Sequence, residues 1–249
     1  MTRADYDEIS RVYDDVREAD VRLIDHFLQH LPSEEALSVL DIGCGTGNYT
    51  DLFQRIAQAR GFRIHGIDPS EGMLTKARQK NPLVVYRQGT AGQIPWKDDL
   101  FDFVYMTDVI HHVPDTQKMF AELQRVTVSR GRVCIVTQSH RQIEARPIVR
   151  FFPGTARVDT DRYPDIGAII KAAQDNSLTC VKEEVLFEGE EVELGPDYLE
   201  LVRKKGYSML SLLEDREYAS GLRALEGALR EGPIKAQLAG ETLIWFTKE

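Results

Sequence analysis

Short apolar runs alternate along this chain with segments in which apolar residues recur three or four positions apart. The runs predict buried strands, because a strand covered on both faces of a sheet is apolar throughout. The segments between them predict helices with one apolar face. We expect strands at 39–42, 62–67, 83–86, 101–106, 131–137, 179–187 and 241–247. This alternation is typical of an α/β fold with a doubly wound sheet.

Three helices are expected between these strands. The second is predicted to begin around Pro69, because proline suits the first turn of a helix. The apolar faces are predicted from Leu52, Phe53, Ile56 and Ala57, from Met73, Leu74 and Ala77, and from Met119, Phe120, Leu123 and Val126.

Two regions, 138–165 and 195–232, exceed what a minimal sheet needs, and the second has a helical pattern. Insertions in α/β folds usually lie over the carboxyl ends of the strands, where ligands bind. We therefore predict one domain, 1–249, with a core at 38–137. Residues 1–37 and the two insertions form a helical substrate cover, with Tyr13 and Arg162 as pocket residues.

The run from Val39 to Gly47 is the most informative feature of the chain. It places glycines at 43, 45 and 47, where the backbone can take positive φ and approach a ligand without a Cβ in the way. The following strand ends at Asp68, whose carboxylate could accept both hydroxyls of a ribose. The two strands and the turn predict half of a βαβ unit that holds an adenosine-containing cofactor.

Asp41 indicates which cofactor this is. A carboxylate just before the first glycine would repel a pyrophosphate bound at the helix N-terminus. S-adenosylmethionine (SAM) has no phosphate, and it carries an ammonium and a sulfonium that an acidic site attracts. The G-x-G-x-G spacing also departs from the dinucleotide fingerprint. Both observations favour SAM.

The segments 41–47, 66–70, 89–95 and 101–114 together resemble class I SAM-dependent methyltransferases, in the small-molecule branch typified by the quinone-biosynthesis enzymes. The resemblance is good over residues 38–137. It implies a Rossmann-like, mostly parallel seven-stranded sheet whose last strand inserts antiparallel between the fifth and sixth. It also implies methyl transfer from SAM to a small-molecule acceptor.

The same resemblance implies a set of cofactor-binding residues. The glycine turn would hold the methionine part, Asp68 the ribose, and the segment from Gly89 to Gly92 the adenine. Thr90 replaces the aspartate often found in that segment. The implied set is Asp41, Gly43, Gly45, Gly47, Asp68, Pro69, Thr90, Ala91 and Thr107.

Methyl transfer from a sulfonium is an in-line displacement, so the enzyme acts mainly by positioning the reactants and excluding water. A general base is needed only when the acceptor carries a proton that must leave. Asp108, His111 and His112 follow the fourth strand and are the candidates. We select His112, which matches a position often occupied by histidine in the family, and place His111 in the substrate pocket. The alternative is that one histidine caps a helix or bonds the backbone.

Composition and charge exclude several classes of protein. The 249 residues carry a formal net charge of −9, which argues against a nucleic-acid partner because phosphate contacts need a basic surface. Cysteines at 44, 134 and 180 give no metal-ligand spacing and suit a reducing compartment. The N-terminus resembles no signal peptide, and no apolar run approaches the roughly 18 residues of a membrane span. We expect a cytoplasmic protein without a metal, and no pattern indicates its oligomeric state.

Some features have a purely structural interpretation. Cys44 is predicted to be a small filler of the turn, and Trp96 a plug of the core before the fourth strand. A solvated strand edge is predicted from Glu183, Glu184, Glu188, Glu190, Glu191 and Glu193. Two other functions stay open: a non-catalytic or regulatory SAM-binding protein, and a nucleotide-dependent oxidoreductase, which Asp41 and the glycine spacing oppose.

Overall fold

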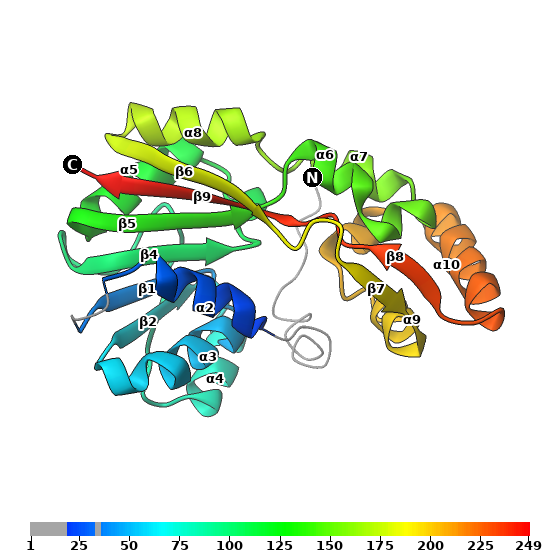
Figure 1. Cartoon of the computed structure of the whole chain (residues 1–249), viewed down its shortest axis with the longest axis horizontal. Coiled ribbons are helices and arrows are strands. Elements are labelled where there is room, and N and C mark those ends of the chain that lie inside the picture. The colour runs from blue at the N-terminus through cyan, green and yellow to red at the C-terminus, as the bar shows by residue number, and fades with distance from the viewer. Residues whose placement is uncertain (1–18, 33–35) are drawn as a thin grey trace.

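The computed structural model describes residues 19–32 and 36–249, so Tyr13 lies outside the described residues. A seven-stranded sheet forms its centre, with the strand order β3-β2-β1-β4-β5-β9-β6 (Figure 1). The strands are β1 (Ser38–Ile42), β2 (Arg63–Asp68), β3 (Val85–Gln88), β4 (Phe101–Thr107), β5 (Thr127–Thr137), β6 (Leu178–Leu186) and β9 (Glu241–Lys248). Strand β9 runs antiparallel between β5 and β6, and the other neighbouring pairs are parallel. The predicted doubly wound sheet is confirmed.

Helices cover both faces of the sheet. On one face α2 (Val21–Gln29) packs on β4 and β9, α3 (Asn48–Ala57) packs on β2, and α4 (Glu71–Lys80) packs on β2 and β3, with η1 (Gln58–Arg60) following α3. On the other face lie α5 (Thr116–Val126) and α8 (Ile166–Asp175). Successive strand residues serve opposite faces: Leu40 belongs to the cluster with α5, and Val39 to the cluster with α2. Both faces are therefore buried, which explains the continuous apolar runs.

A second body of structure, here called the cover lobe, comprises residues 140–160 and 191–237 and lies beyond the carboxyl ends of β4 and β5 (Figure 1). It has its own apolar cluster, which includes Phe152, Leu210 and Leu225. Its elements are α6 (His140–Ala145), η3 (Pro147–Arg150), α7 (Gly154–Thr160), β7 (Glu191–Leu194), α9 (Pro196–Arg203), η4 (Ser208–Leu212), α10 (Asp215–Arg230) and β8 (Ile234–Gln237). The two predicted insertions therefore pack together.

Three expectations are corrected. The third strand begins two residues late, and Leu83 is 66% exposed because the chain is still turning there. Helix α4 begins at Glu71, since the Ser70 hydroxyl accepts a hydrogen bond from the Met73 amide and caps the helix, so Pro69 precedes it. The glutamate run is not one solvated edge: β7 pairs with β8 in a separate two-stranded sheet, and Glu184 is largely buried.

In the described part of the chain, no helix combines the length and the apolar character needed to cross a membrane.

Candidate active site

The turn between β1 and α3 requires glycine at 43 and 47. Gly43, Gly45 and Gly47 have φ values of 72°, 55° and 81°. A Cβ on Gly43 would lie 2.5 Å from Cγ2 of Val109, and one on Gly47 would lie 2.8 Å from the Tyr86 hydroxyl oxygen. Side chains from two other segments therefore close tightly around the turn, and its backbone is the surface left for a ligand.

Asp68 is bound to this turn. Its Oδ2 accepts a hydrogen bond of 3.0 Å from the Gly45 amide, and its Oδ1 accepts one of 2.9 Å from the Ser70 amide. The Gly43 amide donates to the carbonyl of Ile67, so the turn and the end of β2 are joined at several points. The side chain is only 9% exposed. The structure thus brings together the glycines and the carboxylate that the sequence indicates.

Asp41 lies beneath the turn and is 3% exposed. The Thr50 hydroxyl donates a hydrogen bond of 2.7 Å to its Oδ2, which ties β1 to the first turn of α3. Burial, opposed by the Thr50 hydrogen bond and reinforced by the charge of Asp68, raises the pKa of Asp41 to about 7. Asp41 therefore has a structural role beneath the turn.

The segment expected to border an adenine follows β3 beside Asp68. The Gly89 amide donates to the carbonyl of Asp68 at 3.2 Å. Thr90 and Gln93 exchange two backbone hydrogen bonds around a tight turn that exposes Thr90 and buries Ala91. Thr90 is therefore at the surface of the expected cofactor region, whereas Ala91 can contribute only through its backbone.

The end of β4 carries the candidate base. Asp108 follows Thr107 with φ of 56°, an uncommon conformation for a residue other than glycine, and such backbone strain concentrates at functional sites. His111 and His112 lie in the short helix η2 (Ile110–His112), with ring centroids 3.9 Å apart. The His112 amide donates to the Val109 carbonyl. The strand end and its two histidines thus lie at the same edge of the sheet as Asp68.

Tyr163 is a site residue that sequence reasoning missed. Its ring stacks on His111, with centroids 4.1 Å apart and planes 10° from parallel, and it is buried. His140 holds the Tyr163 carbonyl at 2.9 Å, and the Arg146 guanidinium lies 5.3 Å from the ring centroid. The only feature of the sequence that could have pointed to Tyr163 was its position next to Arg162, a predicted pocket residue. Tyr163 connects the cover lobe to the histidines after β4.

Arg162 is held within a buried network. Its guanidinium donates to Oδ1 of Asp159 at 3.0 Å and to the Ser208 hydroxyl at 3.2 Å. Arg146 pairs with the other oxygen of Asp159, so two cations surround one buried carboxylate. The predicted pocket residue therefore also fastens α7 to η4, and the network has an excess of positive charge beside Tyr163.

Two structural predictions are confirmed. Cys44 is buried, and burial raises the pKa of its thiol well above the usual range. Trp96 is buried edge-on against Phe101. A groove of about 560 Å³ opens in the cover lobe, away from the glycine turn. It is lined by Glu144, Ala145, Arg146, Pro147, Val149, Arg150, Phe151, Glu191, Leu194, Ile234, Lys235, Ala236 and Gln237.

Comparison with known proteins shows which protein family this chain resembles. Residues 40–135 match the family model for a methyltransferase domain. The demethylmenaquinone methyltransferase of Streptomyces avermitilis is 29% identical over 198 residues, which cover 69% of this chain and 84% of the relative. The chain spans about half the length of several other curated relatives that it matches.

Solved structures show the same fold. A protein described as a methyltransferase of an antibiotic biosynthesis pathway from Anabaena variabilis superposes with a TM-score of 0.70 at 22% identity, over 93% of this chain and 99% of that one. Phosphoethanolamine N-methyltransferase 2 of Haemonchus contortus, in complex with phosphomonomethylethanolamine and S-adenosylhomocysteine, has a TM-score of 0.58 at 18% identity. It covers 97% of this chain, which matches 57% of that one.

The matched segment thus resembles a methyltransferase domain, and the chain is similar to quinone-biosynthesis methyltransferases.

Proposed function

We propose that this chain binds SAM across the glycine turn and Asp68, and transfers its methyl group to a small acceptor held between β4 and the cover lobe. The hydrogen bond from the Gly45 amide to Asp68 carries the proposal, because it fixes the turn and the carboxylate in one site. The predicted set of cofactor-binding residues, including Pro69, Thr90 and Thr107, is part of the proposal.

The residues of the turn fit SAM. A Cβ at Gly43 or Gly47 would collide with Val109 or Tyr86, so the turn keeps bare backbone at both positions. The Asp68 carboxylate accepts from the amides of Gly45 and Ser70, and a carboxylate is the acceptor-only group that the two donor hydroxyls of a ribose require. The Asp68 carboxylate also suits a ligand that carries an ammonium and a sulfonium.

Bound SAM would supply a methyl group that its sulfonium charge already activates. The protein then has two tasks, which are to align the acceptor with that methyl group and to keep water out, and together they can lower the barrier by about 7–11 kcal/mol. Tyr163 and the cover lobe would exclude water above His111. Thr107 and Asp108, at the end of β4, would border the methionine part.

His112 is proposed as the group that accepts a proton from the acceptor. It lies in η2, beside Asp108 and next to the stacked pair of His111 and Tyr163, where an acceptor under the cover lobe would lie. Imidazole titrates near neutral pH, so it can take a proton from a hydroxyl, amine or acidic carbon as the bond to the methyl group forms.

Isothermal titration with SAM, S-adenosylhomocysteine and NADH tests the proposal. We expect binding of the two sulfur compounds and none of NADH. Asp68→Ala should weaken SAM binding by about 1.5–3 kcal/mol, the range for hydrogen bonds to a charged group. Asp98→Ala is the matched control, because the Asp98 side chain is 70% exposed and pairs with Arg125 away from the turn. Equal SAM affinity in the Asp68 and Asp98 variants would contradict the assignment.

The titration and a turnover assay together separate the alternatives. Binding of NADH alone would favour the oxidoreductase. Binding of SAM without release of S-adenosylhomocysteine across a broad acceptor panel would favour the non-catalytic protein, since fold does not fix function. The cytoplasmic location and the absence of a nucleic-acid partner stay predictions from the sequence.

A further inference from the structure

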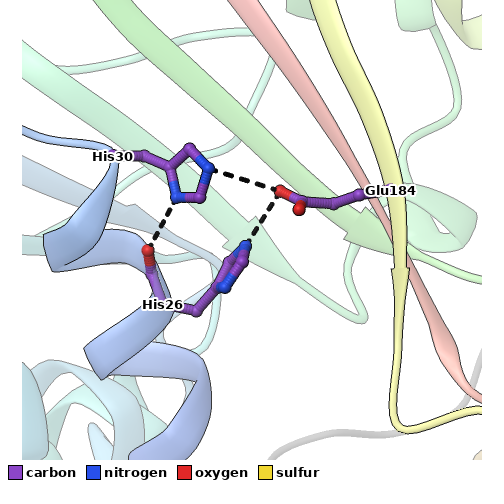
Figure 2. Close-up of side chains that lie close together, drawn as sticks. All are labelled: His26, His30 and Glu184. Atoms are coloured by element: carbon purple, nitrogen blue, oxygen red, sulfur yellow. Dashed lines mark hydrogen bonds and ion pairs between the residues drawn. The ribbon is translucent and has the colours of Figure 1, made fainter.

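Two histidines and a glutamate converge where α2 packs against the edge of the sheet. His26 lies on α2 and His30 ends that helix, four residues later, while Glu184 reaches them from edge strand β6 (Figure 2). His26 Nε2 is 2.9 Å and His30 Nε2 is 3.9 Å from Oε1 of Glu184. One ligand atom from each residue lies within 4.8 Å of the other two. Nothing in the proposed methyl transfer uses this cluster.

The side chains of the cluster are oriented by their neighbours. His30 Nδ1 lies 2.9 Å from the His26 carbonyl, which can only accept, so Nδ1 carries the proton and Nε2 presents its lone pair toward Glu184. The indole of Trp245 stacks on His30, with centroids 4.9 Å apart, and its Nε1–H donates to Glu184 Oε1 at 2.8 Å. Such outer contacts are the ones that fix the ring orientation of metal-bound histidines.

The cluster already attracts a cation. The Lys182 ammonium lies 2.7 Å from His30 Nε2 and 2.7 Å from Glu184 Oε2. An ammonium has no acceptor, so His30 must be the acceptor of this contact. The last turn of α2 adds the negative end of a helix dipole. The long Lys182 side chain is 44% exposed, whereas His26 and Glu184 are largely buried. The lysine can therefore move away while His26 and Glu184 keep their positions.

We propose that His26, His30 and Glu184 form a binding site for a divalent transition metal, with Zn²⁺ as the best fit. Two imidazole nitrogens and a carboxylate oxygen are zinc ligands, and water would complete the tetrahedron. The metal would replace the Lys182 ammonium. His26 Nε2 now donates to the carboxylate, so its proton must move to Nδ1 through solvent, or be lost if the ring is charged, before that nitrogen can bind.

The metal would fasten α2 to the sheet edge at β6. The other end of α2 adjoins the proposed SAM site, because the Asp20 amide donates to the hydroxyl of Tyr49, two residues after Gly47. Metal binding would therefore stabilise the docking of α2. The proposal does not depend on methyl transfer.

Competition of Zn²⁺ between the metal-free full chain, prepared without a histidine tag, and a chromogenic chelator tests the site. We expect one Zn²⁺ per chain and a rise in melting temperature. His26→Ala and His30→Ala should each weaken binding by at least about tenfold. His65→Gln, which removes a half-buried histidine on β2, should leave binding unchanged.

Lys182→Met provides an independent test that does not remove a ligand. It deletes the competing ammonium, so Zn²⁺ affinity should rise, and Co²⁺ should give the visible absorption of a tetrahedral site. Unfolding of the metal-free variants, followed by circular dichroism, shows that each is folded. Wild-type affinity in both histidine variants, or weaker binding in Lys182→Met, would overturn the proposal and leave an ordinary polar network.

Discussion

The Gly45 amide donates a hydrogen bond of 3.0 Å to Oδ2 of Asp68, and so joins the turn after β1 to the end of β2. The bond fixes the carboxylate with the backbone itself, not with another side chain. It also keeps the two halves of the proposed cofactor site in register. A side chain placed in this way loses little conformational entropy when a ligand binds.

Asp68→Asn should separate charge from geometry. Asparagine keeps one carbonyl oxygen for the Gly45 amide but loses the negative charge and the second acceptor. We expect SAM binding weaker than wild type and tighter than in Asp68→Ala, because hydrogen bonds to charged groups are about twice as strong as neutral ones. Calorimetry measures the three affinities. An asparagine variant that binds as weakly as the alanine variant would mean that the charge dominates.

Gly43→Ala should destabilise the protein and abolish SAM binding. The new Cβ would lie 2.5 Å from Cγ2 of Val109, and the residue has φ of 72°, where a side chain costs about 1–2 kcal/mol. Urea unfolding measures the stability. Gly167→Ala is the matched control: it lies in α8 with no atom within 4 Å of its Cβ position, and it should be neutral or gain up to about 1 kcal/mol.

A second substitution tests whether the collision with Val109 causes the loss of stability. Adding Val109→Ala to Gly43→Ala removes the colliding methyl groups and should restore part of the lost stability, although not the cost of the positive φ. If the double variant is no more stable than the sum of the two single changes predicts, the collision is not the cause.

The strands and the glycine turn could be predicted because local pattern determines them. Apolar runs specify strands buried on both faces, and the Gly43–Gly47 spacing specifies the turn. The contacts of Tyr163 could not be predicted, since its stacking on His111 depends on how the chain between α7 and α8 returns to the sheet. The burial of Asp41 could not be predicted either, because the sequence does not show which neighbouring residue a polar side chain in an apolar strand bonds.

The structure of the cover lobe could also be predicted only in part. Helical spacing predicted its helices but not β7 and β8, which are four residues long and pair with each other across about 40 residues of chain. Their alternation is too brief to be distinguished from a loop. Glu184 was assigned to a solvated edge for a related reason: the partners that bury it come from α2 and β9.

Asp41 should make stability depend on pH. Its pKa is about 7 in the folded protein, against 3.8 for an unperturbed group, so folding favours the protonated carboxyl. A raised carboxyl pKa gives stability that is complete below pH 3.8 and is lost as the pH rises toward 7. Asp41→Asn lacks this dependence. Between pH 5 and 8 the wild type should therefore lose about 2–3 kcal/mol relative to the variant.

Urea unfolding of both proteins at the two pH values gives this difference, and other titrating groups cancel in the comparison. A difference that stays constant with pH would show that Asp41 is ionised throughout the range. Asp98→Asn is the control, because the Asp98 side chain is exposed.

Asp108→Gly should raise stability while it lowers activity. The φ of 56° is strained for aspartate and free for glycine, so the fold should gain up to about 1 kcal/mol. The carboxylate at the end of β4 would be lost from the proposed methyl-transfer site, so the turnover rate should fall. Thermal unfolding and the rate of S-adenosylhomocysteine release measure the two effects. A variant that is both less stable and fully active would contradict the functional role of this strain.

Asp159→Asn should be among the most destabilising polar substitutions in the cover lobe. The carboxylate is 2% exposed and pairs with both Arg146 and Arg162, so its loss leaves two largely buried guanidinium groups without their counter-charge. Breaking a buried pair in this way costs about 3–5 kcal/mol. Glu226→Gln, which breaks a more exposed pair with Arg203, should cost at most about 1 kcal/mol. Urea unfolding measures both, and equal losses would show that burial of Asp159 does not set the energy of this network.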